Sequence, residues 1–420
     1  MQNLADIMGC TGAEMVRISS QYCFRLAKVL HFARIFCNTL NSVFRKLLRN
    51  TLGYSLKLFG FRIGLINQSA LGHLAFDTEV HYLESFKERK RKRDIWYPVG
   101  NTANQTLTEY WTAKLSASSN PLMLKIYSAI QPLPRFQNLL LNRELGAGDG
   151  SILDKYGPTF QFTKFQNLRA EELLGKLGID CSKPLVLFCL RDDTYYASKG
   201  DKQNIYIHSH RNVDASEYRD SILFLLSKGF SVMRMGREAE KGIEISHKDF
   251  IDLPFATYLD VQAIGLGDRE ILELALFQRC AFVISTGLGM DALATLFRKR
   301  VYLTDYYSVY NLYSSKLFPM FLPKGYFKIE ENIMLTPGEV LNSEFLKAKS
   351  ALEFEAQGVK LVNCSQSQLL QFVVDIFSLE THQQQPNISK LATYHSKALS
   401  RQDFRGKYVP PLSDYWLNNI

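Results

Sequence analysis

The sequence predicts an α/β protein with two doubly wound domains, each a parallel sheet with helices on both faces. Short apolar runs alternate with helical patterns through much of the chain, and this alternation is typical of such sheets. A chain of 420 residues is long enough to bury two cores of ordinary size. Hydrophobic residues make up 46% and aromatic residues 12%, which indicates a globular chain and excludes a disordered one.

The clearest alternation lies in the C-terminal half. Pro184–Leu190 is a continuous apolar run, as expected for a central parallel strand that is buried on both faces. Further strands are predicted at Phe230–Met235, Phe250–Leu253, Ala281–Ser285 and Val301–Thr304, with helices at Tyr218–Lys228, Asp268–Gln278 and Asp291–Phe297.

An earlier zone repeats this pattern. Arg62–Asn67 is long enough for one buried strand, and a turn at Gly72–His73 leads into a helical pattern. A second strand is predicted at Asp94–Val99 and a second helix at Gln105–Leu115. The stretch from Ser116 to Lys155 is interrupted by prolines and glycines, so we place the domain boundary inside it. The expected division is a helical basic extension over 1–60, α/β domains over 61–150 and 151–380, and a tail over 381–420.

The N-terminal extension is basic and amphipathic. Val29, Phe32, Ala33 and Phe36 have helical spacing, and seven basic residues lie between positions 17 and 49. Such a helix binds an anionic membrane surface, or it packs its apolar stripe on the protein's own core. Both alternatives stay open. A second basic run, over positions 87–93, also favours an anionic partner, or else forms a solvated face.

The formal charge of +9 and the cysteines limit the compartment. The seven cysteines form no C-x-x-C pair, which suggests neither a disulfide framework nor a zinc site and fits a reducing cytoplasm. The first residues lack the apolar region of a secretory signal, and no stretch approaches the ~20 apolar residues of a spanning helix. We therefore expect a cytoplasmic protein, peripheral on the inner face of the membrane if the extension docks there.

A glycine-rich turn is the strongest motif. The strand at Ala281–Ser285 is followed by Thr286, Gly287 and Gly289, and a helix starts at once. Free backbone N–H groups and hydroxyls at such a turn can seat a phosphate. The alternative is a plain strand–helix turn that Asp291 caps.

Four blocks of residues resemble a large bacterial family of GT-B glycosyltransferases, and the glycine turn is similar to that of the heptosyltransferases. The resemblance covers roughly Ile63 to Phe377. The blocks are Arg191, Asp192 and Tyr195; His208, Arg211, Asn212, Val213 and Asp214; Arg234, Met235 and Gly236; and Ser285, Thr286, Gly287, Gly289 and Asp291.

The resemblance implies that residues 61–150 form an acceptor-side domain and residues 151–380 a nucleotide-sugar-binding domain. It also implies roles for single residues. Residues that would bind the donor are Tyr195, His208, Arg211, Asn212, Arg234, Met235, Gly236, Ser285, Thr286, Gly287, Gly289 and Asp291. Arg191, Arg211, Arg234 and Arg237 are candidates to stabilise a diphosphate leaving group, although each could form an ordinary ion pair instead. There is no D-x-D pair in an acidic loop, so we expect no metal ion and no cofactor besides the nucleotide-sugar co-substrate.

Two residues are candidates for the general base that would take a proton from the acceptor hydroxyl. Asp192 follows the central strand, and His73 lies in the first glycine turn. Asp192 could instead cap a helix or pair with Arg211, and His73 could bond a backbone carbonyl. His208 and His210 could face one way as metal ligands do, but no third ligand accompanies them.

The expected function is transfer of a sugar from a nucleotide-activated donor to a glycan or lipid-linked acceptor. A GT-B-shaped sugar-nucleotide epimerase is the alternative enzyme. A basic, non-catalytic adaptor for nucleic acid ranks last, because the chain shows no known nucleic-acid motif.

Overall fold

The computed structural model describes residues 44–88, 93–141, 150–180, 182–198, 200–256, 265–308, 314–382 and Ser413. The predicted helix around Val29–Phe36 and most of the tail lie outside the described residues. The chain divides into two compact units, which we treat separately. Unit 1 comprises residues 1–63, 92–94 and 121–140, and unit 2 comprises 64–91, 95–120 and 141–420. The functional boundary near positions 146–156 stays a prediction.

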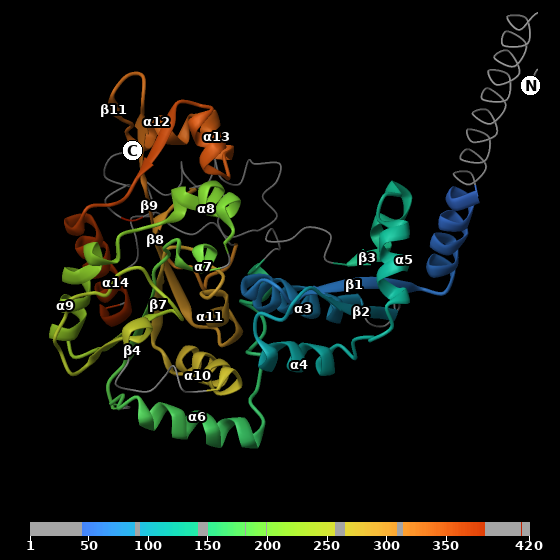
Figure 1. Ribbon diagram of the computed structural model, residues 1–420, viewed down its shortest axis with the longest axis horizontal. Helices are drawn as coiled ribbons and strands as arrows, with labels where there is room; N and C mark the ends of the chain where they lie inside the picture. The colour runs from blue at the N-terminus through green and yellow to red at the C-terminus, as the bar shows by residue number, and fades with distance from the viewer. Residues whose placement is uncertain are drawn as a thin grey trace, which may run out of the picture. The chain divides into compact units, whose positions relative to one another are not determined.

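A six-stranded sheet forms the centre of unit 2 (Figure 1). Its order is β6 (Phe250–Asp252), β5 (Ser231–Met235), β4 (Leu185–Cys189), β7 (Phe282–Ser285), β8 (Arg300–Tyr306) and β9 (Phe321–Pro323). Every neighbouring pair is parallel. The residues of β4, β5 and β7 are all buried, because helices cover both faces. The strands predicted in the C-terminal half are confirmed.

Two layers of helices enclose this sheet. Figure 1 shows α9 (Arg219–Ser227) and α14 (Gln366–His382) on one face, with α10 (Leu266–Arg279) and α11 (Ala292–Leu296) on the other. The helix α6 (Lys164–Lys176) packs on α10. The sequence analysis predicted α9, α10 and α11 but missed α6, although Thr163 and Gln166 form a capping box at its start.

Smaller elements follow β4 and β9, and none of them was predicted. The helices α7 (Thr194–Ala197) and α8 (Lys202–His208) lie between β4 and α9 in the sequence. An antiparallel sheet is formed by β10 (Gly325–Lys328), β11 (Ile333–Met334) and β12 (Val359–Val362). The short helices α12 (Pro337–Leu341) and α13 (Ala351–Glu355) lie between β11 and β12 in the sequence.

The predicted elements of the earlier zone are also confirmed. They are β1 (Phe61–Asn67), α3 (Thr78–Glu88), β2 (Arg93–Val99) and α4 (Gln105–Lys114), and the strand order is β2–β1–β3 with β3 at Leu140–Leu141. A one-turn π-helix, η1 (His73–Asp77), precedes α3. Buried carboxylates attach this zone to the rest of unit 2: Glu270 of α10 accepts the N–H of Thr106 at 3.0 Å, and Glu79 pairs with Arg298 at 2.9 Å.

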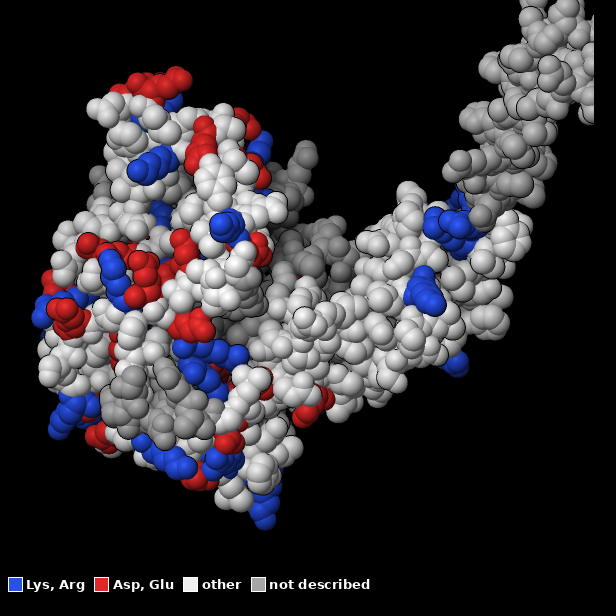
Figure 2. All heavy atoms as spheres, viewed as in Figure 1, with Lys and Arg blue, Asp and Glu red and all other residues white. Residues whose placement is uncertain are grey.

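Unit 1 contains a helix over residues 44–58 and α5 (Leu122–Ile130), followed by the 3-10 turn η2 (Pro134–Leu139). The prolines that suggested irregular structure flank α5 instead of interrupting it: Pro121 precedes its first residue and Pro132 follows its last. Gly53 of the first helix lies against the ring of Phe136, where a β-carbon would collide. In the part of the chain that the structure describes, no helix has the length and apolarity to cross a membrane. On the face seen in Figure 2, this unit shows basic and uncharged side chains.

Candidate functional site

The glycine loop after β7 is braced from inside by a buried carboxylate. Asp291 accepts the hydroxyl of Ser285 at 2.8 Å and the N–H of Leu288 at 3.0 Å. The Ser285 hydroxyl in turn accepts the N–H of Gly287 at 3.1 Å. Burial raises the pKa of Asp291 to about 6. Asp291 therefore holds the loop in shape, and its part in donor binding stays a prediction.

Two glycines allow this loop its close contacts. Gly287 has φ of +79°, and a β-carbon there would lie 2.5 Å from the ring of Tyr306. A β-carbon on Gly289 would meet the backbone N of Gly72 at 3.1 Å, so the loop touches the start of η1. Side chains at these positions would push the three segments apart.

The hydroxyls of the loop form hydrogen bonds within the protein, and their expected contact with a phosphate stays a prediction. Thr286 accepts the N–H of Arg191 at 3.0 Å, and its own N–H bonds the carbonyl of Cys189 at 3.0 Å. Ser285 is held by Asp291, as described above. The helix that follows, α11, has five residues and is shorter than the seven predicted. These contacts fix the carboxyl ends of β4 and β7 side by side.

Two arginines with partly unsatisfied side chains lie at this edge. Arg191 directly follows β4, and its guanidinium stacks 5.3 Å from the ring centre of Tyr196. Arg211, in the 3-10 turn η4 (Ser209–Arg211), donates to the carbonyl of Gly287 and lies 5.0 Å from the ring centre of Tyr307. The buried Nε of each arginine has no hydrogen-bond partner. Among the described residues, neither guanidinium forms an ion pair with a carboxylate.

The two positive charges of Arg191 and Arg211 lie near each other, and in the described part of the chain neither pairs with a carboxylate that would offset their repulsion. Burial, together with the nearby Arg211, lowers the pKa of Arg191. Buried cations are normally paired, because removal of a charge from water is costly. A pair of guanidiniums in this state is an arrangement that an anion would complete.

His208 and His210 lie beside the arginines. The ring of His208 stacks on Tyr196 with centroids 5.7 Å apart, and its buried Nδ1 has no partner. Burial and Arg211 lower the pKa of both, that of His210 to about 3. Both imidazoles are therefore neutral near pH 7. In the part of the chain that the structure describes, no cluster of three or more His, Cys, Asp or Glu side chains could hold a metal ion.

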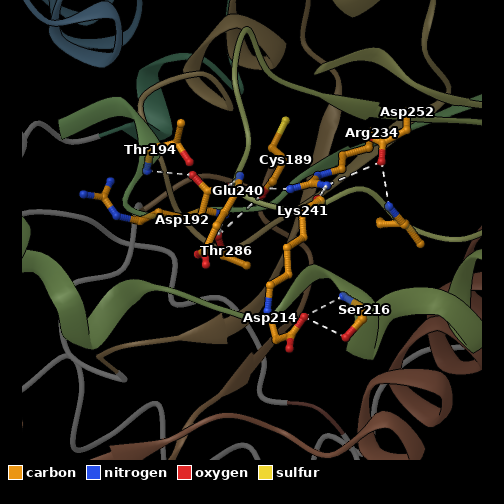
Figure 3. Close-up of polar contacts among 12 residues, drawn as sticks. Cys189, Asp192, Thr194, Asp214, Ser216, Arg234, Glu240, Lys241, Asp252 and Thr286 are labelled. Carbon is orange, nitrogen blue, oxygen red and sulfur yellow. Dashed lines mark hydrogen bonds and ion pairs between the residues drawn. The ribbon is translucent and has the colours of Figure 1, made fainter. Parts of the chain in front are cut away.

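Asp192 and Arg234 belong to a separate network of hydrogen bonds and ion pairs, which holds the loop after β5 in place (Figure 3). One oxygen of Asp192 accepts the N–H of Thr194 at 3.1 Å and the other accepts that of Glu240 at 2.9 Å. The buried Arg234 donates to the carbonyl of Lys241 at 2.6 Å and reaches between Asp192 and Asp252, at 3.7 and 3.5 Å. Arg234 thus forms the structural ion pairs that the sequence left open as its alternative role.

The other residues of the β5 block also have structural contacts. Met235 is buried in the sheet, and Gly236 has φ of +151°, where a β-carbon would lie 3.1 Å from the ring of Pro254. Arg237 makes a two-bond ion pair with the buried Glu273, at 2.8 and 3.0 Å. The buried Nε of Arg234 also has no hydrogen-bond partner, but Arg234 and Arg237 both form ion pairs with carboxylates, which Arg191 and Arg211 do not among the described residues.

Two donor-binding candidates remain. The side chain of Asn212 donates to Asp193, and its Oδ1 is buried without a partner. The buried Lys324 bonds the carbonyl of Asn212 at 2.7 Å, which fixes this residue beside Arg211. The backbone of Tyr195 lies in α7, and its side chain is outside the description.

His73 is paired with a carboxylate that the sequence analysis did not single out. Its Nδ1 lies 2.6 Å from Oδ2 of Asp77, whose side chain is 5% exposed, while that of His73 is 34% exposed. Both residues belong to the π-helix η1, a feature that is frequent at functional sites. The four-residue spacing of His73 and Asp77 was the available signal. Gly72, next to His73, is the residue that contacts the glycine loop.

Sequence comparison gives no assignment: no family model matches the chain, and no curated protein matches it. Solved structures give distant likenesses. A glycosyl transferase of family 9 from Veillonella parvula has a TM-score of 0.30 and 9% identity, over 58% of this chain and 81% of that one. ADP-heptose heptosyltransferase II of E. coli has a TM-score of 0.29 and 10% identity, over 58% of this chain and 84% of that one. A Listeria monocytogenes protein assigned as UDP-N-acetylglucosamine 2-epimerase has a TM-score of 0.26 and 8% identity, over 86% of this chain and 75% of that one. Likenesses this distant carry no argument about activity.

Proposed function

We propose that the chain is a GT-B-type glycosyltransferase that moves a sugar from a nucleotide-activated donor to a glycan or lipid-linked acceptor without a metal ion. Residues 61–150 would serve the acceptor and residues 151–380 the donor. The observation that supports this best is the pair Arg191 and Arg211. Both guanidiniums lie at the carboxyl edge of a parallel sheet, where ligands of such folds bind, and both have an unsatisfied Nε.

The diphosphate of a nucleotide sugar fits these groups by charge and by geometry. A guanidinium is planar and donates two parallel hydrogen bonds to phosphate oxygens. When the bond from the sugar to the diphosphate breaks, negative charge grows on the leaving group. Two fixed cations in a water-poor site stabilise that charge without rearrangement. The neutral His208 and the amide of Asn212 add polar atoms beside them.

His73 is the base that we propose for the acceptor hydroxyl. Asp77 binds its Nδ1, which leaves Nε2 as the proton acceptor. The acceptor oxygen would then attack the anomeric carbon while the proton passes to Nε2 and the diphosphate leaves. Asp192 stays a second candidate, although each of its oxygens already accepts a backbone N–H.

A thermal-shift screen tests the donor site. UDP-, GDP-, ADP-, dTDP- and CMP-sugars are titrated into the protein, and the cognate donor should raise the melting temperature by mass action. Arg211→Gln and Arg191→Gln should each weaken its binding at least about 10-fold, as expected when a charged hydrogen bond is lost. Arg219→Gln is the matched control, since Arg219 is half-exposed and lies outside the site.

Two results would contradict the proposal. One is that no nucleotide sugar stabilises the wild-type chain; the other is that both variants bind the donor as tightly as the control does. If a donor binds, product analysis with and without an acceptor separates transfer from epimerisation. A donor that is converted to its epimer without any acceptor would assign the chain to the epimerases.

A further inference from the structure

Unit 1 carries basic residues almost without acidic ones. Its described residues include one acid, Asp94, and the following eight bases: Arg45, Lys46, Arg49, Lys57, Arg62, Arg93, Lys125 and Arg135. Asp94 is neutralised by Arg62 through two hydrogen bonds of 2.7 and 2.8 Å. The described part of unit 1 therefore carries a strongly positive formal charge.

Large apolar side chains are exposed on the same unit. Along the helix at 44–58 and directly after it, the exposed residues are Phe44 (64%), Leu47 (64%), Leu48 (59%), Tyr54 (54%), Leu58 (81%) and Phe59 (65%). On α5, Leu122 is 51% exposed and Leu124 36%. Isolated exposed apolar residues are common on protein surfaces, but a row of them along one helix marks an interaction site.

The apolar row of this helix points away from the face that packs. Gly53 is the position that contacts Phe136 of η2. At about 100° per residue, Phe44 lies roughly 180° around the helix from Gly53, and Leu48 and Leu58 lie roughly 140° from it. A helix normally turns its apolar side to its own core. Here the apolar row, which we call the 44–59 stripe, faces outward, and by the same count Lys46 and Lys57 lie roughly 20–40° from Gly53, on the opposite, polar side of the helix.

We propose that the 44–59 stripe and the basic residues on the polar side of the same helix dock unit 1 on an anionic lipid bilayer. Apolar side chains on this stripe would enter the boundary between headgroups and acyl chains, while Lys46 and Lys57 would lie near the lipid phosphates. Lys125 beside Leu122 and Leu124 gives α5 the same combination, and Figure 2 shows basic and uncharged side chains over this unit. Charge attraction and apolar insertion add together in such binding.

The chemistry of the surface favours a bilayer over other partners. Nucleic acid would use the basic residues but leave the leucines and phenylalanines in water. A second copy of this surface would carry the same positive charge and would be repelled. The inference is independent of the proposed function, because the residues of the donor site belong to unit 2.

Vesicle co-sedimentation of the full chain tests the inference. Vesicles of phosphatidylcholine are compared with vesicles that also contain phosphatidylglycerol, at low and high salt. The wild-type chain should pellet with the anionic vesicles and be released by salt, since screening shortens the range of the charges. Leu47→Asn with Leu58→Asn should lower the partition coefficient at least about 10-fold. Lys46→Glu with Lys57→Glu should lower it at least about 30-fold.

Matched controls lie on unit 2. Leu168→Asn with Leu352→Asn changes two leucines that are 65% and 50% exposed, and Lys202→Glu with Lys248→Glu makes the same charge change at exposed positions. Both control pairs should bind vesicles as wild type does, and thermal shift should give the same donor affinity for every variant.

Four outcomes would overturn the inference. The wild-type chain could stay in the supernatant with both kinds of vesicle. The leucine variant of the stripe could bind as tightly as the wild type, which would move any docking to residues outside the stripe. Light scattering could show that the same variant turns a dimer into a monomer while neither binds vesicles. Finally, the chain could bind duplex DNA or RNA and ignore the vesicles.

Discussion

Single residues at the carboxyl edge of the central sheet divide into two groups. Asp291, Asp192 and Arg234 form hydrogen bonds with the backbone of loops and hold those loops in place, and Arg234 also pairs with carboxylates. Arg191 and Arg211 are held by backbone and ring contacts, and among the described residues neither guanidinium pairs with a carboxylate. Arginine occurs in both groups, so only the surroundings of an arginine show whether it stabilises a loop or is available to a ligand.

Gly287 gives a test at the scale of one residue. Gly287→Ala places a β-carbon 2.5 Å from the Tyr306 ring at φ of +79°, so it combines backbone strain with a steric clash. Its free energy of unfolding, measured in urea, should fall by about 2–4 kcal/mol.

Gly178→Ala is the control for backbone strain alone. Gly178 has φ of +65°, and nothing lies within 4 Å of its β-position. This variant should lose only about 1 kcal/mol. Because Arg211 bonds the carbonyl of Gly287, Gly287→Ala should also weaken donor binding, which Gly178→Ala should not. Equal losses of stability in the two variants would show that the clash with Tyr306 is absent.

At the scale of an element, the π-helix η1 brings His73 and Asp77 together. Residues four apart in a helix share a face, and in η1 the side chain of Asp77 is buried while that of His73 is 34% exposed. A base needs this combination, because its orienting partner must be fixed and its other nitrogen must be accessible.

Three variants separate the candidate bases. His73→Gln should lower kcat at least about 100-fold with little change in donor affinity, since general-base catalysis contributes at least that much. Asp77→Asn should also lower kcat, because the imidazole loses the carboxylate that orients it. Asp192→Asn should keep most of the activity if its role is to hold the loop at Glu240. The reverse pattern, with Asp192→Asn inactive and His73→Gln active, would make Asp192 the base.

At the scale of unit 2 as a whole, a buried ion pair joins residues far apart in sequence. Glu79 of α3 has no exposed side-chain surface and lies 2.9 Å from Arg298, which also bonds the carbonyls of Tyr156 and Gly157 at 2.7 and 2.8 Å. Burial raises the pKa of Glu79, whereas Arg298 opposes that rise. The pair therefore links the first zone to the segment that precedes α6.

Removal of Arg298 should destabilise the fold, because the buried carboxylate of Glu79 would lose its cation. Arg298→Met should lower the free energy of unfolding by about 3–5 kcal/mol near neutral pH. The loss should shrink as the pH falls toward the ordinary pKa of a glutamate, because a protonated Glu79 needs no cation in the folded state.

Urea titrations of the wild type, Arg298→Met, Glu79→Gln and the double variant at two pH values check this. The double variant should be more stable than Arg298→Met, since the uncompensated charge is gone. A loss in Arg298→Met that stays the same at both pH values would mean that Glu79 is not charged when folded.

The sequence by itself determined the local elements. The periodicity of apolar residues and the positions of glycines are local properties of the chain. They predicted the strands of the central sheet, the helices α9, α10 and α11, and the strand–turn–helix units around His73 and Gly287. The sequence also determined that arginines follow β4 and lie within the H-x-x-R block. The sequence did not predict α5, because the prolines near its two ends indicated irregular structure. Only the packing of the residues between them shows that they form a helix.

The tertiary structure alone decided which of the four candidate arginines pair with a carboxylate among the described residues. Arg191, Arg211, Arg234 and Arg237 are equivalent in the sequence, but the acids that neutralise Arg234 and Arg237 come from β6 and α10, 18 and 36 residues away. Likewise, the helix at 44–58 has a plain amphipathic pattern, and only its contact with Phe136 fixes which side faces outward. Pairing of charges and direction of faces depend on long-range contacts, and one-dimensional patterns do not contain them.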